Sequence, residues 1–187
     1  RALRPAAHFL ELAHRLDRDT SGCLVIAKKR STLRAFHEAM RNGGVDKRYL
    51  ALVQGRWRGG KVEAPLLKNV LSSGERMVKV NTAGKYALSL FSPKTLYKDA
   101  SLMEVKLITG RTHQIRVHAR HSGHPIAGDD KYGDPEFNRR MAGFGLKRLF
   151  LHAGSLHFTL DTTVHVEAPL EEGLKQVLKQ MEGKDVA

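Results

Sequence analysis

The apolar residues of this chain fall in short runs separated by turn-forming residues, and this pattern limits the fold more than any other feature of the sequence. Runs of this length suit strands better than helices. They are Tyr49–Val53, Met77–Val80, Ala87–Phe91, Leu102–Leu107, Leu149–Leu151 and Val164–Val166. Many short strands with few helices predict an α+β fold, with a mixed, largely antiparallel sheet and flanking helices.

Three stretches have the apolar spacing of amphipathic helices. The first follows Ser31, a predicted N-cap, and ends at Gly43-Gly44. The second runs from Thr112 to His121, with Gly123 as its C-terminal stop. The third follows Pro169, and its apolar face carries Leu174, Val177, Leu178 and Met181.

Length and composition indicate one globular domain that spans residues 1–187. The chain is 41% hydrophobic and shows no repeat or linker that would divide it. No apolar run approaches the roughly 18–20 residues that cross a bilayer, and no signal peptide is visible. Cys23 is the single cysteine, so an internal disulfide is excluded and a reducing cytoplasm fits.

The charge of the chain favours a nucleic acid as its partner. There are 32 Lys and Arg residues against 19 Asp and Glu residues, which gives a net charge of +13. A strongly basic surface neutralises phosphates and gains affinity by releasing their counterions. An acidic membrane surface is the weaker alternative, because no strongly amphipathic basic helix is present.

The stretch from His14 to Gly22 crowds two carboxylates, two arginines and two hydroxyls into nine residues. Asp17 and Asp19 could form a carboxylate pair, a metal cradle, or one catalytic group beside a structural one. We interpret Asp19 as part of a turn, together with the hydroxyls that follow it. Asp17 is the candidate catalytic carboxylate. Leu24–Ala27, directly after the stretch, is predicted to be a buried strand, with Cys23 as a small core residue.

A second stretch, Gly110–His118, offers a helix N-terminus and an arginine among apolar neighbours. Thr112 can cap the helix, whose free N–H groups would form an anion site. Arg116 lies between two apolar residues, and a buried guanidinium needs a carboxylate or phosphate partner. Asp17 is one candidate for that partner. A surface arginine on an RNA-facing helix is the alternative.

The loop from His124 to Asp134 is rich in Gly, Asp and Pro and has the character of a functional loop. Three histidines precede it, so a metal site has to be considered, with Asp129 and Asp130 as ligands of a metal-dependent RNA nuclease. The HExxH pattern is absent and the surroundings are basic, so a metal is not favoured. No P-loop, GxGxxG or GxSxG motif is found, and we expect no cofactor. Tyr49 and Trp57 could stack on bases or pack in the core.

Taken together, these stretches resemble the motifs of the RluA-type pseudouridine synthases. His14–Gly22 is similar to the family's HRLDxxTSG motif, and Lys47–Gly55 to its KxYxAxVxG strand. Gly110–His118 resembles GRTHQIRVH, His124–Gly133 resembles HPIxGDxxYG, and Leu149–Ala153 resembles the RLFLHA stretch. The resemblance covers essentially the whole chain. It implies the pseudouridine synthase catalytic fold and isomerisation of specific uridines to pseudouridine in 23S ribosomal RNA.

The resemblance also implies roles for single residues. Asp17 matches the catalytic aspartate, Tyr49 the active-site tyrosine, and Arg116 the arginine that pairs with that aspartate. Leu151 matches an apolar residue that lines the pocket, and Arg15 the arginine that enters the RNA stack in place of the flipped base. Further candidates for RNA contacts are Arg111, His113 and Gln114.

Family members of this type usually carry an S4-like RNA-binding domain and a KPxGxxVH strand before the catalytic motifs. Neither is found in this sequence, so we expect an N-terminally truncated catalytic domain, acting as a monomer. Composition and charge alone leave open a non-catalytic basic RNA-binding module, which would need no carboxylate. The initial step of the reaction, at C1′, at C6 or at the ribose, is also left open.

Overall fold

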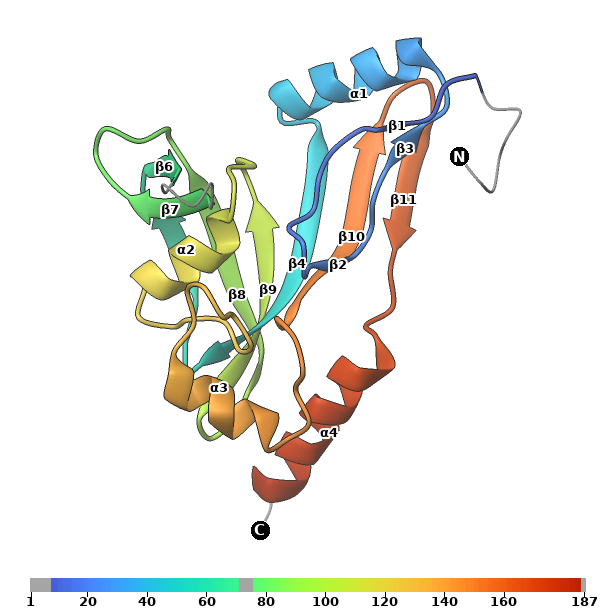
Figure 1. Cartoon of the computed structure of the whole chain (residues 1–187). Coiled ribbons are helices and arrows are strands. Elements are labelled where there is room, and N and C mark those ends of the chain that lie inside the picture. Colours follow the sequence, from blue (N-terminus) through green and yellow to red (C-terminus); the bar gives the residue numbers. More distant parts are fainter. Residues whose placement is uncertain (1–7, 71–75, 186–187) are drawn as a thin grey trace.

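A mixed sheet forms the centre of the computed structural model, which describes residues 8–70 and 76–185. Its strands follow the order β11-β10-β4-β9-β8-β5, and all neighbours along this path are antiparallel (Figure 1). Their bounds are β4 Val45–Gln54, β5 Gly60–Glu63, β8 Leu88–Leu96, β9 Ala100–Leu107, β10 Leu151–Thr159 and β11 Thr163–Glu167. The short strand β2 (Ser21–Gly22) pairs in parallel with β10. The predicted α+β class with a mixed, largely antiparallel sheet is therefore confirmed.

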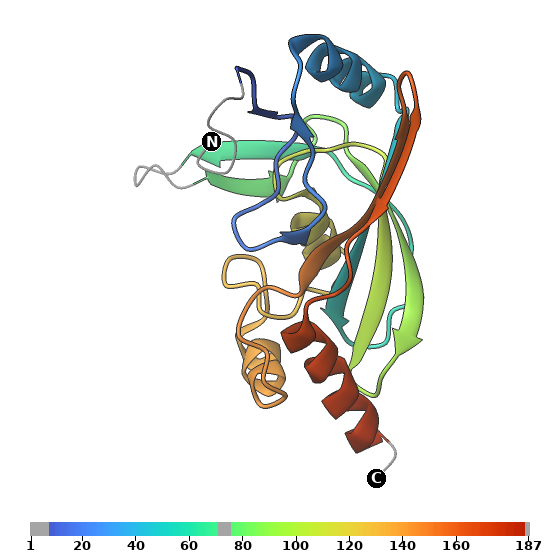
Figure 2. The same ribbon diagram turned by 90° about the vertical axis from the view of Figure 1, so that its right-hand side faces the viewer.

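The remaining elements lie around this sheet. They are β1 (Glu11–Leu12) paired with β3 (Ile26–Ala27), β6 (Leu66–Val70) paired with β7 (Arg76–Val80), and the helices α1 (Arg30–Arg41), α2 (Gln114–His121), α3 (Pro135–Ala142) and α4 (Glu172–Asp185). Figure 2 shows α2, α3 and the β6–β7 hairpin on the same side of the sheet as residues 8–27. None of the helices in the described residues is long and apolar enough to span a membrane.

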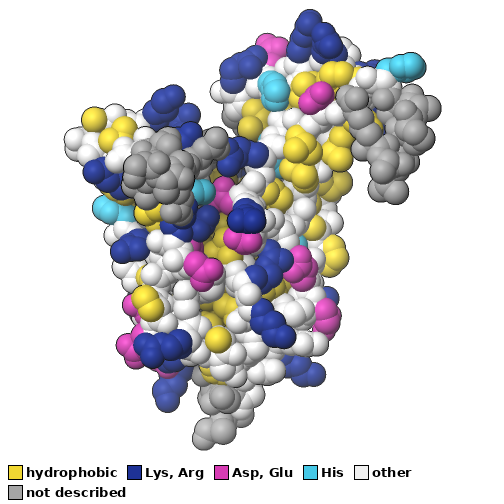
Figure 3. Space-filling model, viewed as in Figure 1, with side chains coloured by type: hydrophobic (Ala, Val, Ile, Leu, Met, Phe, Trp, Pro, Cys, Tyr) yellow, Lys and Arg dark blue, Asp and Glu magenta, His cyan; other side chains and the backbone are white. Residues whose placement is uncertain are grey.

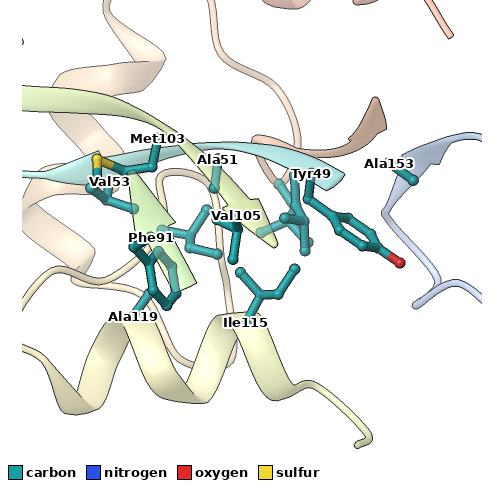
Figure 4. Close-up of a cluster of buried hydrophobic side chains, with 12 residues drawn as sticks. Tyr49, Ala51, Val53, Phe91, Met103, Val105, Ile115, Ala119 and Ala153 are labelled. Atoms are coloured by element: carbon teal, nitrogen blue, oxygen red, sulfur yellow. The ribbon is translucent and has the colours of Figure 1, made fainter. Parts of the chain in front are cut away.

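The alternation of side chains along β4 divides the core between the two faces of the sheet. Tyr49, Ala51 and Val53 point to one face, where residues of α2 such as Ile115 cover them (Figure 4). Leu52 points to the other face and belongs to a second cluster, to which α4 contributes Leu174, Val177 and Met181. The predicted apolar face of the last helix is confirmed.

The prediction of a buried strand at Leu24–Ala27 is wrong in its extent and burial. Only Ile26 and Ala27 form a strand, and Leu24 and Ile26 are 43% and 54% exposed. The reason is that β3 pairs only with the short β1, so alternate side chains face the solvent. Val25 packs against a third core cluster, formed by Ala13, Phe36, Val45, Leu156 and Phe158, whereas Leu24 and Ile26 are exposed. Cys23 is partly buried and packs against that cluster.

Two predicted N-caps are also wrong. Helix α1 begins at Arg30, so Ser31 lies within its first turn and Lys29 stands at the N-cap. Helix α2 is preceded by His113, not Thr112, and no side chain caps it. His113 has φ of 53° and ψ of 22°, in the left-handed region. Gly123 follows this helix with φ of +80°, as expected of a C-terminal stop.

Gly22 allows the segment that carries Asp17 to lie against the sheet. Its φ is +107°, and a Cβ atom built on it would lie 2.1 Å from the backbone oxygen of Ala153 in β10. Cys23 N–H then donates a hydrogen bond of 2.9 Å to the same oxygen. A side chain at position 22 would therefore push this segment away from the sheet.

We predict that Gly22→Ala lowers the free energy of unfolding by roughly 3 kcal/mol or more, because both the backbone strain and the contact with Ala153 oppose it. Gly43→Ala is the matched control, since its φ is +74° but nothing lies within 4 Å of the added Cβ. That variant is expected to lose about 1–2 kcal/mol from the left-handed backbone alone. Urea unfolding of both variants measures the difference, and equal losses would contradict the close approach of Gly22 to the sheet.

Candidate active site

A cavity of about 270 Å³ opens between the segment that carries Asp17, strand β4 and the loop before α2. This volume is close to the small end of ligand pockets, about 300 Å³. The structure brings together in its lining every predicted site residue except Arg116: Arg15, Asp17, Tyr49, Arg111, His113, Gln114 and Leu151. Asp17 is the one carboxylate in that lining within the described chain.

Arg116 lies behind Asp17 and forms ion pairs with two carboxylates. Its Nη1 atom lies 3.6 Å from Oδ2 of Asp17. Its Nε atom donates a hydrogen bond to Oδ2 of Asp129 and its Nη2 atom donates one to Oδ1, both at 2.7 Å. The predicted ion pair between Arg116 and Asp17 is present, but the shorter, bidentate contact goes to Asp129. Arg116 also lies over the ring of Tyr132, at 5.0 Å from its centroid.

Asp129 is buried, with 2% of its surface exposed, and both of its oxygens are engaged. Besides Arg116, the backbone N–H groups of Lys131 and Tyr132 donate to Oδ1 at 3.0 and 2.9 Å. Burial on its own would raise the pKa of Asp129, but the hydrogen bonds and charge of Arg116 outweigh it and lower the pKa. Burial on its own would lower the pKa of Arg116, but the hydrogen bonds and charge of Asp129 outweigh it and raise that pKa. Arg116 therefore presents a permanent positive charge to Asp17.

These contacts give Asp129 a structural task and argue against its use as a ligand in a metal-dependent nuclease. Within the described ranges, no group of three or more His, Cys, Asp or Glu side chains is placed to hold a metal ion. The sequence signal for Asp129 was its position in the loop after α2. Only the folded loop shows that it is the principal partner of Arg116.

His113 faces the other oxygen of Asp17. Its Nε2 atom lies 4.0 Å from Oδ1 of Asp17, and its Nδ1 atom lies 2.8 Å from the hydroxyl of Tyr132. The Tyr132 hydroxyl already accepts the backbone N–H of Val78 at 3.0 Å, so its own proton is free to go to Nδ1. The proton of the neutral ring then sits on Nε2 and faces Asp17. Burial lowers the pKa of His113, although the charge of Asp17 acts in the other direction. The lowered pKa favours this neutral form.

Tyr49 forms the floor of the cavity together with Leu151. The Tyr49 residue is 8% exposed, and Figure 4 shows its hydroxyl pointing away from Val105 and Ile115, to the side on which Ala153 lies. Burial and then the charge of Asp17 raise the pKa of Tyr49 to about 12. At pH 7 only on the order of one molecule in 10⁵ is ionised, so Tyr49 acts as a phenol with a proton to donate.

The structure distinguishes among the predicted RNA-contacting residues. Arg15 and Arg111 are exposed, and Arg111 uses only Nε, in a 2.9 Å bond to the backbone oxygen of Tyr86. Gln114 is 2% exposed, and its amide makes four hydrogen bonds within the chain, to Thr109, Arg111, Leu88 and Ser89. This geometry argues against an RNA contact by Gln114, because its hydrogen-bonding groups are already used to shape the loop.

The structure also decides between the two interpretations of Trp57 and corrects the interpretation of Asp19. Trp57 lies outside the cavity lining, 4.5 Å from the ring of Phe91 and stacked on His124 at 4.8 Å, so it packs in the fold. The turn after Asp17 is closed by the backbone, with Thr20 N–H donating to the oxygen of Asp17 at 3.0 Å. Ser21 helps by bonding to His152 at 2.9 Å. In the described contacts the Asp19 carboxylate caps no backbone group of this turn.

Sequence reasoning missed Lys47 as part of the site. The residue lines the cavity from β4, two positions before Tyr49. The available signal was the period of the strand, which places residues 47 and 49 on the same face.

The fold and the arrangement around Asp17 agree with comparisons to known proteins. The sequence model of the RNA pseudouridylate synthase family matches residues 5–121, and the chain belongs to this family. Two human structures share its fold: RNA pseudouridylate synthase domain containing 4, with a TM-score of 0.78 at 25% identity over 94% of this chain and 77% of that chain, and domain containing 1, with 0.75 at 24% over 96% and 83%.

Curated relatives are closer in sequence. Ribosomal large subunit pseudouridine synthase C of Escherichia coli (strain K12) is 55% identical over 188 residues, which cover 97% of this chain and 59% of that protein. The protein of the same name from Haemophilus ducreyi is 53% identical over 186 residues, 97% of this chain and 58% of its own. The chain thus spans about three fifths of the length of these relatives.

We predict that Asp129→Asn lowers the free energy of unfolding by about 3–5 kcal/mol at neutral pH, because Arg116 loses its bidentate, charged partner. Asp130→Asn is the matched control, since this neighbour is exposed, and it should cost less than about 0.5 kcal/mol.

The pH dependence gives a second measure of the same ion pair. Because the pKa of Asp129 is lowered in the folded state, its charge contributes stability above the unfolded carboxyl pKa of about 3.9 and loses that contribution as the pH falls. The gap in unfolding free energy between wild type and Asp129→Asn should therefore narrow below about pH 4. A gap that stays constant down to acid pH would contradict the assignment of the charge to Asp129.

Proposed function

We propose that this chain isomerises uridines to pseudouridine in 23S ribosomal RNA, with Asp17 as the catalytic residue. The observation that carries the proposal is the placement of Asp17 in a cavity with Tyr49, backed by the Arg116–Asp129 pair. Membership of the RNA pseudouridylate synthase family supports the reaction. The names of the curated relatives support large-subunit ribosomal RNA as the substrate.

The reaction rearranges one nucleotide and transfers nothing to another molecule. The bond from C1′ of the ribose to N1 of uracil breaks, the base turns in the cavity, and C1′ bonds to C5. The proton lost from C5 is balanced by one gained at N1. Asp17 acts as nucleophile or base, and attack at C1′, attack at C6 and removal of a ribose proton are all compatible with its place in the cavity.

Arg116 and His113 serve the reaction by orienting Asp17. The Arg116 guanidinium lies 3.6 Å from one oxygen of the carboxylate, and the His113 ring lies 4.0 Å from the other. The side chains of both residues are only 11% and 12% exposed, so solvent screens them little. Because Arg116 stays behind Asp17, the cavity side of the carboxylate is left for the nucleotide.

The base must leave the RNA stack to enter the cavity, which costs a few kcal/mol. Arg15 is exposed at the cavity and is proposed to fill the gap that the base leaves. Tyr49 offers a ring face to the uracil and Leu151 an apolar wall. Figure 3 shows many Lys and Arg side chains on the face that carries α2 and α3, where phosphates would contact the protein.

The proposal includes a monomer that works on RNA in the cytoplasm. The cytoplasm is the place where bacterial ribosomal RNA is made and modified. A non-catalytic RNA-binding module is the alternative, and it offers no reason for the buried ion pairs that converge on Asp17.

Asp17→Asn tests the catalytic assignment. We expect pseudouridine formation to fall by at least about 10³-fold, because an amide is neither a nucleophile nor a base at neutral pH. RNA affinity should stay within about threefold, since no positive charge is lost. Asp19→Asn, an exposed neighbour with the same change in charge, should keep its activity.

The readouts are pseudouridine mapping by chemical derivatisation of a 23S ribosomal RNA transcript and filter binding of the same RNA. Product formed by Asp17→Asn at the wild-type rate would overturn the proposal. Binding of wild-type protein without product would favour the non-catalytic module. RNA that is cleaved in the presence of magnesium but stays intact in EDTA would point to the nuclease.

Tyr49→Phe separates the ring of Tyr49 from its hydroxyl. The variant keeps the aromatic face, so RNA affinity should not change. The single-turnover rate should fall about 10²–10⁴-fold, because the hydroxyl that donates the proton is removed. Phe differs from Tyr by the hydroxyl alone, so the ring keeps its packing in the first core cluster. An unchanged rate would show that Tyr49 acts by stacking alone. Rapid-quench measurement of product at saturating enzyme gives the rate.

A further inference from the structure

Lys47 projects into the cavity from the same face of β4 as Tyr49, because side chains two residues apart on a strand point the same way. Arg48, between them, points to the opposite face. There it donates to Glu104 at 2.8 Å and to Asp46 at 3.3 Å. The strand thus separates one basic side chain with two acidic partners from another that faces the cavity.

The ammonium group of Lys47 has no acidic partner. Among the described residues no carboxylate oxygen lies within 4.0 Å of its Nζ atom, and its one hydrogen-bond contact is the sulfur of Met40 at 3.8 Å. Gly110 keeps space beside it, since a Cβ atom there would lie 3.3 Å from Nζ. The residue is partly buried, and burial lowers the pKa of Lys47.

The neighbouring histidines supply no negative charge to the Lys47 ammonium group. His14 accepts the backbone N–H of Val25 at Nε2, at 3.1 Å, so that nitrogen carries no proton and the ring is neutral. His37 lies 2.9 Å through Nε2 from the backbone oxygen of Ala13, which only accepts hydrogen bonds. A partly desolvated cation without a partner destabilises the fold. A ligand that brings an anion would remove that cost.

We propose that Lys47 binds a phosphate of the RNA next to the nucleotide whose base enters the cavity. This rests on the proposed function, because it takes RNA as the ligand. A phosphodiester carries a full negative charge and suits the compact ammonium of lysine as a point charge. A uracil carbonyl would offer only a dipole. Lys47 is thus a substrate-binding residue, placed by β4 at a fixed spacing from the base-stacking Tyr49.

The test is Lys47→Met, which keeps the length of the side chain and removes its charge. Binding of a 23S ribosomal RNA transcript is measured over a range of salt concentrations. We expect affinity to fall about tenfold and the slope of log K against log salt to become shallower by about 0.7–0.9, the value for one phosphate contact. Lys47→Arg should restore the slope. Lys175→Met, a change of an exposed lysine on α4, should alter neither quantity.

Thermal unfolding without RNA is the second readout. Lys47→Met should have a Tm equal to or above that of wild type, because it removes an unpaired, partly buried charge. A lower Tm would indicate a structural role and overturn the proposal. Weaker binding with an unchanged salt slope would also overturn it, since the contact would then be to a neutral group.

The outcomes also separate this proposal from the proposed function. A wild-type protein that forms pseudouridine, beside a Lys47→Met variant with unchanged affinity and slope, refutes the phosphate contact alone. A wild-type protein that binds no RNA refutes both.

Discussion

The bidentate bond between Arg116 and Asp129 is the interaction on which the rest of the site depends. It fixes a guanidinium at one end of α2, and the third nitrogen of that group then lies 3.6 Å from Asp17. Three segments meet there: the segment of Asp17 and, almost a hundred residues further along the chain, helix α2 and the loop that follows it. With two carboxylates around one arginine, the group keeps a net negative charge, which remains on the side that faces the cavity.

The loop of Asp129 holds Asp17 by a second route as well. Tyr132 donates its backbone N–H to Asp129 and places its hydroxyl against His113, which faces the other oxygen of Asp17. His113 adopts a left-handed backbone to reach this position, at a cost of about 1–3 kcal/mol for residues in such regions. The loop therefore controls the orientation of Asp17 through both of its oxygens, although none of its residues needs to contact the nucleotide.

Local patterns in the sequence predicted the class of the sheet and helices α1, α2 and α4, but not helix α3 or the extent of β3. Most of the residues that meet at the cavity were predicted from the resemblance to the pseudouridine synthase motifs. A buried arginine needs an acid, and this rule led from Arg116 to Asp17 across almost a hundred residues. The same rule could not identify Asp129 as the nearer partner, because pairing between a helix and its following loop depends on how the loop closes. The sequence could not show the contacts of Gln114, or decide between stacking and packing for Trp57, for a similar reason. Their hydrogen bonds and ring contacts come from strands β8 and β9 and from His124, which are distant in sequence.

Charge placement shows how a basic protein can hold a carboxylate at a cavity. Arg15, Lys47 and Arg111 line the cavity together with Asp17, so the lining offers three cations to a phosphate, while Arg116 holds the acid from outside the lining. Arg116 does not compete for the substrate because Asp129 already occupies two of its nitrogens. Among the described residues, the cations of the site therefore divide into Arg116, which Asp129 and Asp17 neutralise, and those without an acidic partner, which we propose the RNA backbone neutralises. In that proposal, a nucleotide bound through its phosphate brings its base between Tyr49 and Asp17 without direct competition between its charge and that of Asp17.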